Sequence, residues 1–323
     1  PDLATVSTVF MSLEDINAAG LQLKRLISDG LVYIDIAHYI LMSMSVRDEY
    51  GVLFSRRSPI ACWISTTLIF FSGTFLTNFL LGDPVVAPFF KVRDISVSTV
   101  VWYAVFYSPF DAVPSICGFF PILVILSILK ELQRTHKICL GVLSAVKLFP
   151  EDILLHVLIG TTKGAASGVL RTAQEFVHGT WRPEGNEILR PSTTTKATIL
   201  SAAIFRLFSS ANHGIAYLLV AVLLVGVKLL SLFALTKQPF TLFETKSGNL
   251  LFGTSDEDVR QELNSFLYGV SSPSFVLFIF TIFLRFLLFL ANVNDGFKFD
   301  KPLSVLFLRE LYYFTDEMKL IRS

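Results

Sequence analysis

The chain has 323 residues, of which 53% are hydrophobic and 16% are charged, and its mean hydropathy is +0.61. Soluble domains carry about 25% charged residues, so this composition excludes an ordinary soluble protein and indicates an integral membrane protein. The formal net charge of +1 gives no basic excess of the kind that nucleic-acid binding requires, so we expect no nucleic-acid partner.

Apolar runs along the chain predict seven transmembrane helices. A helix that crosses a hydrocarbon core of about 30 Å needs roughly 20 mainly apolar residues. The runs 58–82 and 207–227 contain no Asp, Glu, Lys or Arg, whereas residues 1–30 are too polar to span. The predicted spans cover residues 31–46, 58–82, 96–110, 117–146, 153–179, 195–210 and 207–227. We therefore expect an all-α membrane protein with a seven-helix unit over residues 31–236.

Basic residues in the short loops predict the orientation, because cytosolic loops are enriched in Lys and Arg. One set of loops holds Arg47, Arg56, Arg57, Arg182, Arg190 and Lys196, and the other holds Lys91, Arg93 and Lys147. The larger set favours the first side as cytosolic, which makes residues 1–30 a luminal N-terminal segment. Residues 237–323 would form a C-terminal tail. Its apolar run 275–291 fits an eighth span, an interfacial segment or a helix packed on the bundle.

The first six spans divide into two units of three. The middle span of the first unit carries Gly73 and Gly82, and that of the second carries Gly160, Gly164 and Gly168. A unit with an odd number of spans, when repeated, places its copies in opposite orientations, and such inverted repeats put the functional site near the midplane. The alternative is that these glycines only allow tight helix packing. We predict two inverted three-helix repeats plus a seventh helix.

The fourth span carries a cluster of basic residues. Lys130, Arg134 and Lys137 are spaced i, i+4, i+7 and share one helical face, with Lys130 near the middle of the membrane. Each base costs roughly 2.5–3.5 kcal/mol to insert there, and Glu131 can offset one of them. The remaining charge requires an external anion, and a phosphorylated lipid head group suits a basic pocket between helices. The alternative is that the basic end of this helix lies in the cytosol.

The fifth span adds a lysine inside a stripe of glycines. Gly160, Gly164 and Gly168 recur every four residues, and Lys163 lies on the adjacent face. Glycine costs roughly 1 kcal/mol in a helix interior, which favours a bend at this stripe. We interpret the stripe as a pore-lining bend in preference to simple packing.

No motif in the chain indicates catalysis or metal binding. Cys62, Cys117 and Cys139 lack metal-ligand spacing, and His136 and His156 have no second ligand near them in the sequence. Serine elbows, Walker loops and Rossmann glycine patterns do not occur. We therefore expect neither an enzyme nor a metal site.

Several segments together resemble the trimeric intracellular cation (TRIC) channels, most closely the type B members of animals, with a nematode as a fitting source. Residues 130–137 (KELQRTHK) resemble the basic motif of the family's fourth helix, and residues 160–168 (GTTKGAASG) the glycine-lysine-glycine signature of its fifth. Three further stretches are similar: residues 55–61 (SRRSPIA), 80–84 (LLGDP) and 181–189 (WRPEGNEIL), the last followed by Thr195 and Lys196. The resemblance covers residues 31–235 and does not include the tail.

This resemblance implies a potassium channel of the endoplasmic or sarcoplasmic reticulum that supplies counter-ion current during calcium release. It implies a homotrimer with one pathway in each protomer, occupied by phosphatidylinositol 4,5-bisphosphate. The implied lipid-binding residues are Lys130, Arg134, Lys137 and Gly164. The implied residues of the pore and its helix kinks are Gly73, Gly160, Lys163, Gly164 and Gly168.

Two other classes of membrane protein fit parts of the pattern. A secondary transporter also suits inverted repeats with charge at the midplane. A seven-helix receptor is less compatible with the three-plus-three organisation and the midplane lysines.

Overall fold

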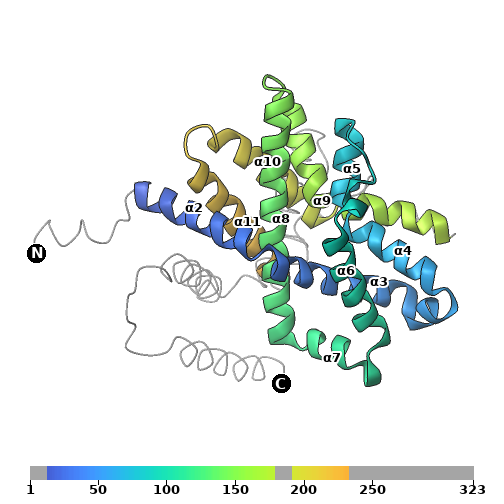
Figure 1. The fold of residues 1–323 in the computed structure, drawn as a ribbon. Helices are drawn as coiled ribbons and strands as arrows, with labels where there is room; N and C mark the ends of the chain where they lie inside the picture. The colour runs from blue at the N-terminus through green and yellow to red at the C-terminus, as the bar shows by residue number, and fades with distance from the viewer. Residues whose placement is uncertain (1–12, 179–190, 233–323) are drawn as a thin grey trace, which may run out of the picture.

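The computed structural model describes residues 13–178 and 191–232, and every regular element in these ranges is a helix (Figure 1). The predicted all-α class is therefore confirmed for this part of the chain. The helices are α2 (Leu13–Asp29), α3 (Leu31–Arg57), α4 (Pro59–Phe70), α5 (Ser72–Leu81), η1 (Ala87–Phe90), α6 (Val92–Tyr107), η2 (Pro109–Asp111), α7 (Ala112–Gly118), α8 (Phe120–Leu148), α9 (Ile153–His178), α10 (Thr193–Phe208) and α11 (His213–Leu232). The predicted tail, with its run 275–291, lies outside the described residues.

The helices are more numerous and more broken than the predicted seven spans. By length and composition, two described helices can cross a membrane alone, over Ile153–Arg171 and His213–Leu232. Three bent pairs bring this number to five: α2 with α3 (70°), α4 with α5 (63°), and the segment Pro109–Gly118 with α8 (69°). The count of seven spans therefore remains a prediction.

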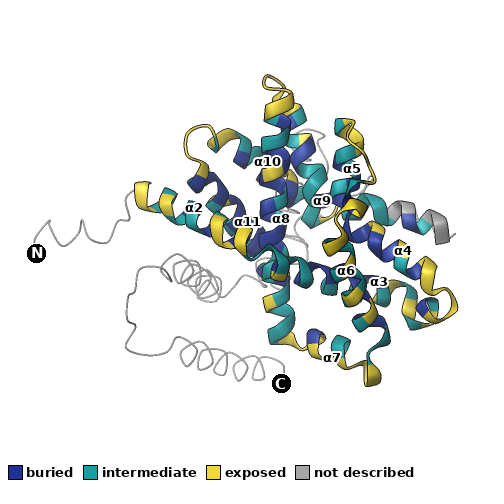
Figure 2. Cartoon of the chain, viewed as in Figure 1, coloured by how far each residue is buried: buried dark blue, intermediate teal, exposed yellow. Residues whose placement is uncertain are grey.

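Two clusters of buried apolar residues divide the bundle. One is built from α3, α4, α5 and α6, and the other from α2, α8, α10 and α11 with Ile34 of α3. α11 packs on α8 in the second cluster, and Figure 2 shows buried residues of both helices in dark blue. Between the two clusters α3 packs on α8 and α5 packs on α9. The first helices of the two predicted repeats, α3 and α8, are thus neighbours. The second helices, represented by α5 and α9, are neighbours as well.

The N-terminal helix α2 is part of the bundle, although residues 1–30 were expected to form a separate segment. Its Gly20 approaches Gly214 at the start of α11 so closely that a Cβ on either glycine would overlap backbone atoms of the other helix. The Asn17 side chain accepts a hydrogen bond of 2.9 Å from the Gly214 amide, which is one of the unpaired amides at a helix start. Leu23 and Ile27 lie on the same face of α2 and are buried. Small residues and one polar contact therefore hold this helix against α11.

Prolines at two helix junctions remove backbone donors, and side chains from other helices replace them. Pro59 has no N–H for the carbonyl of Ser55, and the Tyr107 hydroxyl donates to that carbonyl at 2.8 Å. Pro109 likewise leaves the carbonyl of Val105 without its usual donor. The Arg47 guanidinium donates to it at 2.7 Å and forms an ion pair of 2.9 Å with Asp111. These contacts join α3 to α6 and fix the position of the turn after α6.

Candidate functional site

A cleft lies between α3, α5, α8 and α9. It brings together six of the residues predicted for the site: Lys130, Arg134 and Lys137 from α8, Lys163 and Gly164 from α9, and Gly73 from α5. His38, Ser72, Gln133, Ala166 and Ser167 complete its lining. The other two predicted residues, Gly160 and Gly168, lie on α9 and do not line this cleft. The helical spacing of the basic residues therefore predicted a real juxtaposition, and α9 supplies the fourth cation.

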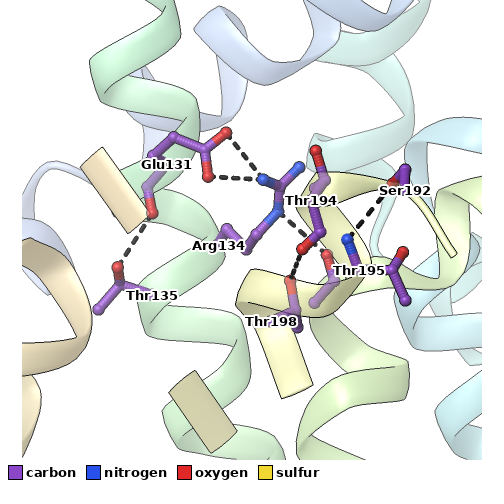
Figure 3. Close-up of polar contacts among 8 residues, drawn as sticks. Glu131, Arg134, Thr135, Ser192, Thr194, Thr195 and Thr198 are labelled. Atoms are coloured by element: carbon purple, nitrogen blue, oxygen red, sulfur yellow. Dashed lines mark hydrogen bonds and ion pairs between the residues drawn. The ribbon is translucent and has the colours of Figure 1, made fainter. Parts of the chain in front are cut away.

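Arg134 is held by contacts within the protein. Its Nη1 donates to both carboxylate oxygens of Glu131, at 2.8 and 2.5 Å, and its Nε donates to the carbonyl of Gly164 at 3.2 Å (Figure 3). Glu131 is buried, so the ion pair lies away from solvent. Glu131 thus neutralises the positive charge of Arg134, which lies about one turn further along the helix. Nη2 of the guanidinium has no hydrogen-bond partner among the described residues, so one nitrogen of Arg134 is available to an anion while the Glu131 pair is intact.

The three lysines of the cleft carry its surplus charge. Among the described residues no carboxylate lies within 4.0 Å of the ammonium group of Lys130, Lys137 or Lys163. Asp35 of α3 attracts Lys137 from a longer distance, but its carboxylate accepts a hydrogen bond from Gln133. Half-buried cations without a partner are costly in a medium of low dielectric constant. The cleft is therefore suited to bind an anion.

Glycines allow the helices around the cleft to approach one another. A Cβ on Gly73 would overlap the Lys163 carbonyl, so this glycine lets α5 lie directly on α9. The break between α4 and α5 falls at Phe71, two residues before Gly73, and agrees with the bend that the family resemblance implies for this region.

In the fifth span α9 runs as one helix from Ile153 to His178, and the bend at its glycine stripe stays a prediction. A Cβ on Gly160 would meet Val142 of α8 at 2.5 Å, and a Cβ on Gly164 would meet Ile138 of α8 at 2.5 Å. Side chains of α8 fill the space beside these glycines, so the stripe serves close packing along a continuous helix. These contacts support the packing alternative for these two residues, and a role in the pore stays a prediction.

Comparisons with known proteins identify the family. A profile described as "TRIC channel" matches residues 49–235. The chain is 42% identical to trimeric intracellular cation channel type 1B.1 of Caenorhabditis elegans, over 70% of this chain and 79% of that protein. The chain belongs to the TRIC channel family. The predicted resemblance, including its type B character, is therefore confirmed, and the family is one of membrane cation channels, not of enzymes.

Solved TRIC structures share the fold. A trimeric intracellular cation channel from C. elegans, determined in the absence of Ca²⁺, superposes with a TM-score of 0.64 at 42% identity. The match covers 69% of this chain and 98% of that one. A second structure, described as a TRIC counter-ion channel in calcium release, gives a TM-score of 0.60 at 31% identity and covers 63% of this chain and 93% of that one.

Two basic residues of this TRIC channel that the sequence analysis did not single out lie near the cleft. Lys228 of α11 follows directly after the predicted seventh span, and its charge acts on Glu131 and Arg134. Arg171 of α9 donates to the Ser45 hydroxyl at 2.8 Å and lies 3.4 Å from the Glu49 carboxylate. The spacing of Lys163 and Arg171, eight residues apart on one face of α9, could have indicated the second residue.

The buried histidines of the TRIC fold have protein partners. Nε2 of His156 contacts the Phe149 carbonyl at 2.5 Å, and Nδ1 accepts from Nε of Arg206 at 2.8 Å. His136 lies 3.4 Å from the Tyr217 hydroxyl. Within the described ranges no three His, Cys, Asp or Glu side chains gather in a way that could hold a metal ion. These contacts join α9 to the C-terminal end of α8 and to α10, and join α8 to α11.

Proposed function

We propose that this TRIC protein conducts potassium across the endoplasmic or sarcoplasmic reticulum membrane and supplies counter-ion current during calcium release. Family membership and a structural neighbour described as a counter-ion channel in calcium release support this function. The names of the relatives support a homotrimer, with one pathway in each protomer. The loop charges support a luminal N-terminus, and the packing of α3 on α8 and of α5 on α9 supports two inverted repeats plus a seventh helix.

The observation that carries the proposal is the cleft, whose three lysines have no ion-pair partner among the described residues. Bare lysines would repel potassium, so a conducting protomer needs an anion that neutralises them. Phosphatidylinositol 4,5-bisphosphate supplies several negative charges on one head group and reaches a cleft between helices from the membrane. Lys130 and Lys137 would take its phosphates as point charges, with one nitrogen of Arg134 and the α9 backbone near Gly164 beside them. The lipid then forms part of the wall of the pathway.

Recording from the purified full chain in planar bilayers tests the channel. We expect unitary potassium currents, because a channel passes many ions in each opening. Potassium uptake into proteoliposomes without unitary currents at any voltage or calcium concentration would overturn the proposal and favour a secondary transporter.

Mass spectrometry of lipid extracted from the purified protein tests the ligand. We expect the wild type to retain phosphatidylinositol bisphosphate and the double variant Lys130→Ala/Lys137→Ala to lose most of it. Lys147→Ala is the matched control, because Lys147 is exposed at the end of the same helix. Equal lipid content in the double variant and in the control would contradict the assignment.

A further inference from the structure

The break in the second span leaves the backbone carbonyl of Phe70 without its helical partner. In a continuous helix the carbonyl of Phe70 would accept from the amide of Thr74. That amide instead donates to the carbonyl of Phe71 at 2.9 Å, because the chain turns at this point. An unpaired carbonyl in a buried position is costly, so another donor is required.

His38 of α3 provides that donor. Its Nε2 lies 3.3 Å from the Phe70 carbonyl oxygen, and since a carbonyl only accepts, Nε2 carries the proton of this hydrogen bond. The side chain is buried, and its other nitrogen, Nδ1, has no partner among the described residues. The structure therefore places His38 at the helix break.

The same histidine lines the basic cleft, so the break and the cleft share a residue. Beyond the break, Ser72 and Gly73 form the cleft wall contributed by α5. Gly73 lies against the Lys163 carbonyl, where there is no space for a Cβ. The start of α5 is thus fixed at two points: by His38 at Phe70, and by α9 at Gly73. A change in the angle of the break would move Gly73 away from Lys163 and open this wall.

We propose that His38 is a positioning residue, whose hydrogen bond to Phe70 sets the angle between α4 and α5 and thereby shapes the wall of the anion-binding cleft. The part of this role that concerns ligand affinity rests on the proposed function. The part that concerns the helix angle does not.

Pulsed electron paramagnetic resonance measures the angle directly. Spin labels on Ile60 of α4 and Phe79 of α5 are suitable, because these side chains are 73% and 68% exposed. The two labels are introduced into the full chain after its three cysteines have been replaced. Co-expression with an excess of unlabelled chain ensures that the measured distances lie within one protomer. We expect a narrow distribution for the wild type, a shifted or broadened one for His38→Phe, and recovery in His38→Gln, whose amide can still donate. If His38→Phe does not assemble, His38→Met also lacks a donor and carries the same expectation.

Binding of a soluble dioctanoyl phosphatidylinositol bisphosphate provides the second readout. Loss of one hydrogen bond to a buried carbonyl should lower the affinity about five- to tenfold in His38→Phe, and His38→Gln should restore most of it. Tyr107→Phe is the matched control, because it removes the donor to a different unpaired carbonyl, that of Ser55, outside the cleft. It should leave both the label distances and the affinity unchanged.

Two results would overturn the positioning role: an unchanged distance distribution in His38→Phe and His38→Met, or the same change in Tyr107→Phe. If the distances change as expected but the wild type does not bind the phosphoinositide, the role of His38 stands and the proposed ligand is wrong.

Discussion

Glycines within the helices of this molecule differ in whether another helix occupies the space that a side chain would fill. Gly73 lies against the backbone of Lys163, which cannot move aside as a flexible side chain could. Gly226 lies in α11 with no heavy atom within 4 Å of the position that a Cβ would occupy. The first glycine is therefore required by a contact between helices, and the second is not required by any contact within the described protomer.

Gly73→Ala should lower the stability of the purified protein by about 1–3 kcal/mol, because the added methyl group forces α5 away from α9. Gly226→Ala should leave the stability unchanged or raise it by up to about 1 kcal/mol, because alanine is the better helix former. Apparent melting temperatures of the two variants in the same detergent check this. Equal melting temperatures would show that α5 does not depend on the close approach at Gly73.

For single residues, the sequence predicted which basic residues share a face of α8, but not which of them the Glu131 carboxylate neutralises. The i, i+4, i+7 spacing is a property of one helix, and the structure brings Lys130, Arg134 and Lys137 together as the spacing requires. Glu131 is three residues from Arg134 and adjacent to Lys130, and only the side-chain geometry shows that it pairs with the arginine. Lys228 was missed because it reaches the site from a helix far away in the sequence.

At the scale of the elements, a side chain from another helix completes each of three helix junctions. Tyr107 donates to Ser55 before α4, His38 donates to Phe70 before α5, and Arg47 donates to Val105 at the end of α6. Prolines, Pro59 and Pro109, mark the first and third junctions in the sequence. No proline marks the second, which depends on packing between α3, α5 and α9, so its position could not be derived from local sequence.

Arg47→Met should lower the stability by about 1.5–3 kcal/mol, because it removes a charged donor from a carbonyl that Pro109 leaves unpaired. It also breaks the ion pair with Asp111, in a turn where Phe110 and Asp111 both have a φ of 55°. The control is Arg57→Met, which changes an exposed arginine at the end of the same helix. Thermal unfolding of both variants checks the prediction, and a drop of the same size in the control would contradict it.

At the scale of the whole molecule, the cleft lies where the two clusters of buried apolar residues meet. Contacts of α3 with α8 and of α5 with α9 join the clusters, and cations from α8 and α9 gather at that junction. Two units of three spans were predicted from the sequence, and their relation as a repeat stays a prediction. The docking of α2 on α11 was not predictable, because it depends on Asn17 and Gly20 meeting Gly214 nearly two hundred residues later. Surplus positive charge at the junction opposes the association of the halves, and an anion bound in the cleft, as proposed, would relieve this repulsion.

An anionic ligand should therefore stabilise the fold. At a concentration about 100 times its Kd, soluble dioctanoyl phosphatidylinositol bisphosphate should add roughly 2.7 kcal/mol to the stability of delipidated protein, because it binds only the folded state. Dioctanoyl phosphatidylinositol, which lacks the ring phosphates, should give a much smaller change.

Lys130→Met keeps the length of the side chain but removes a half-buried charge that has no ion-pair partner among the described residues. It should raise the melting temperature without ligand and reduce the shift that the ligand causes. If Lys130→Met instead lowers the melting temperature without ligand, Lys130 has a stabilising partner in the free protein, and the cleft does not need an external anion for this residue.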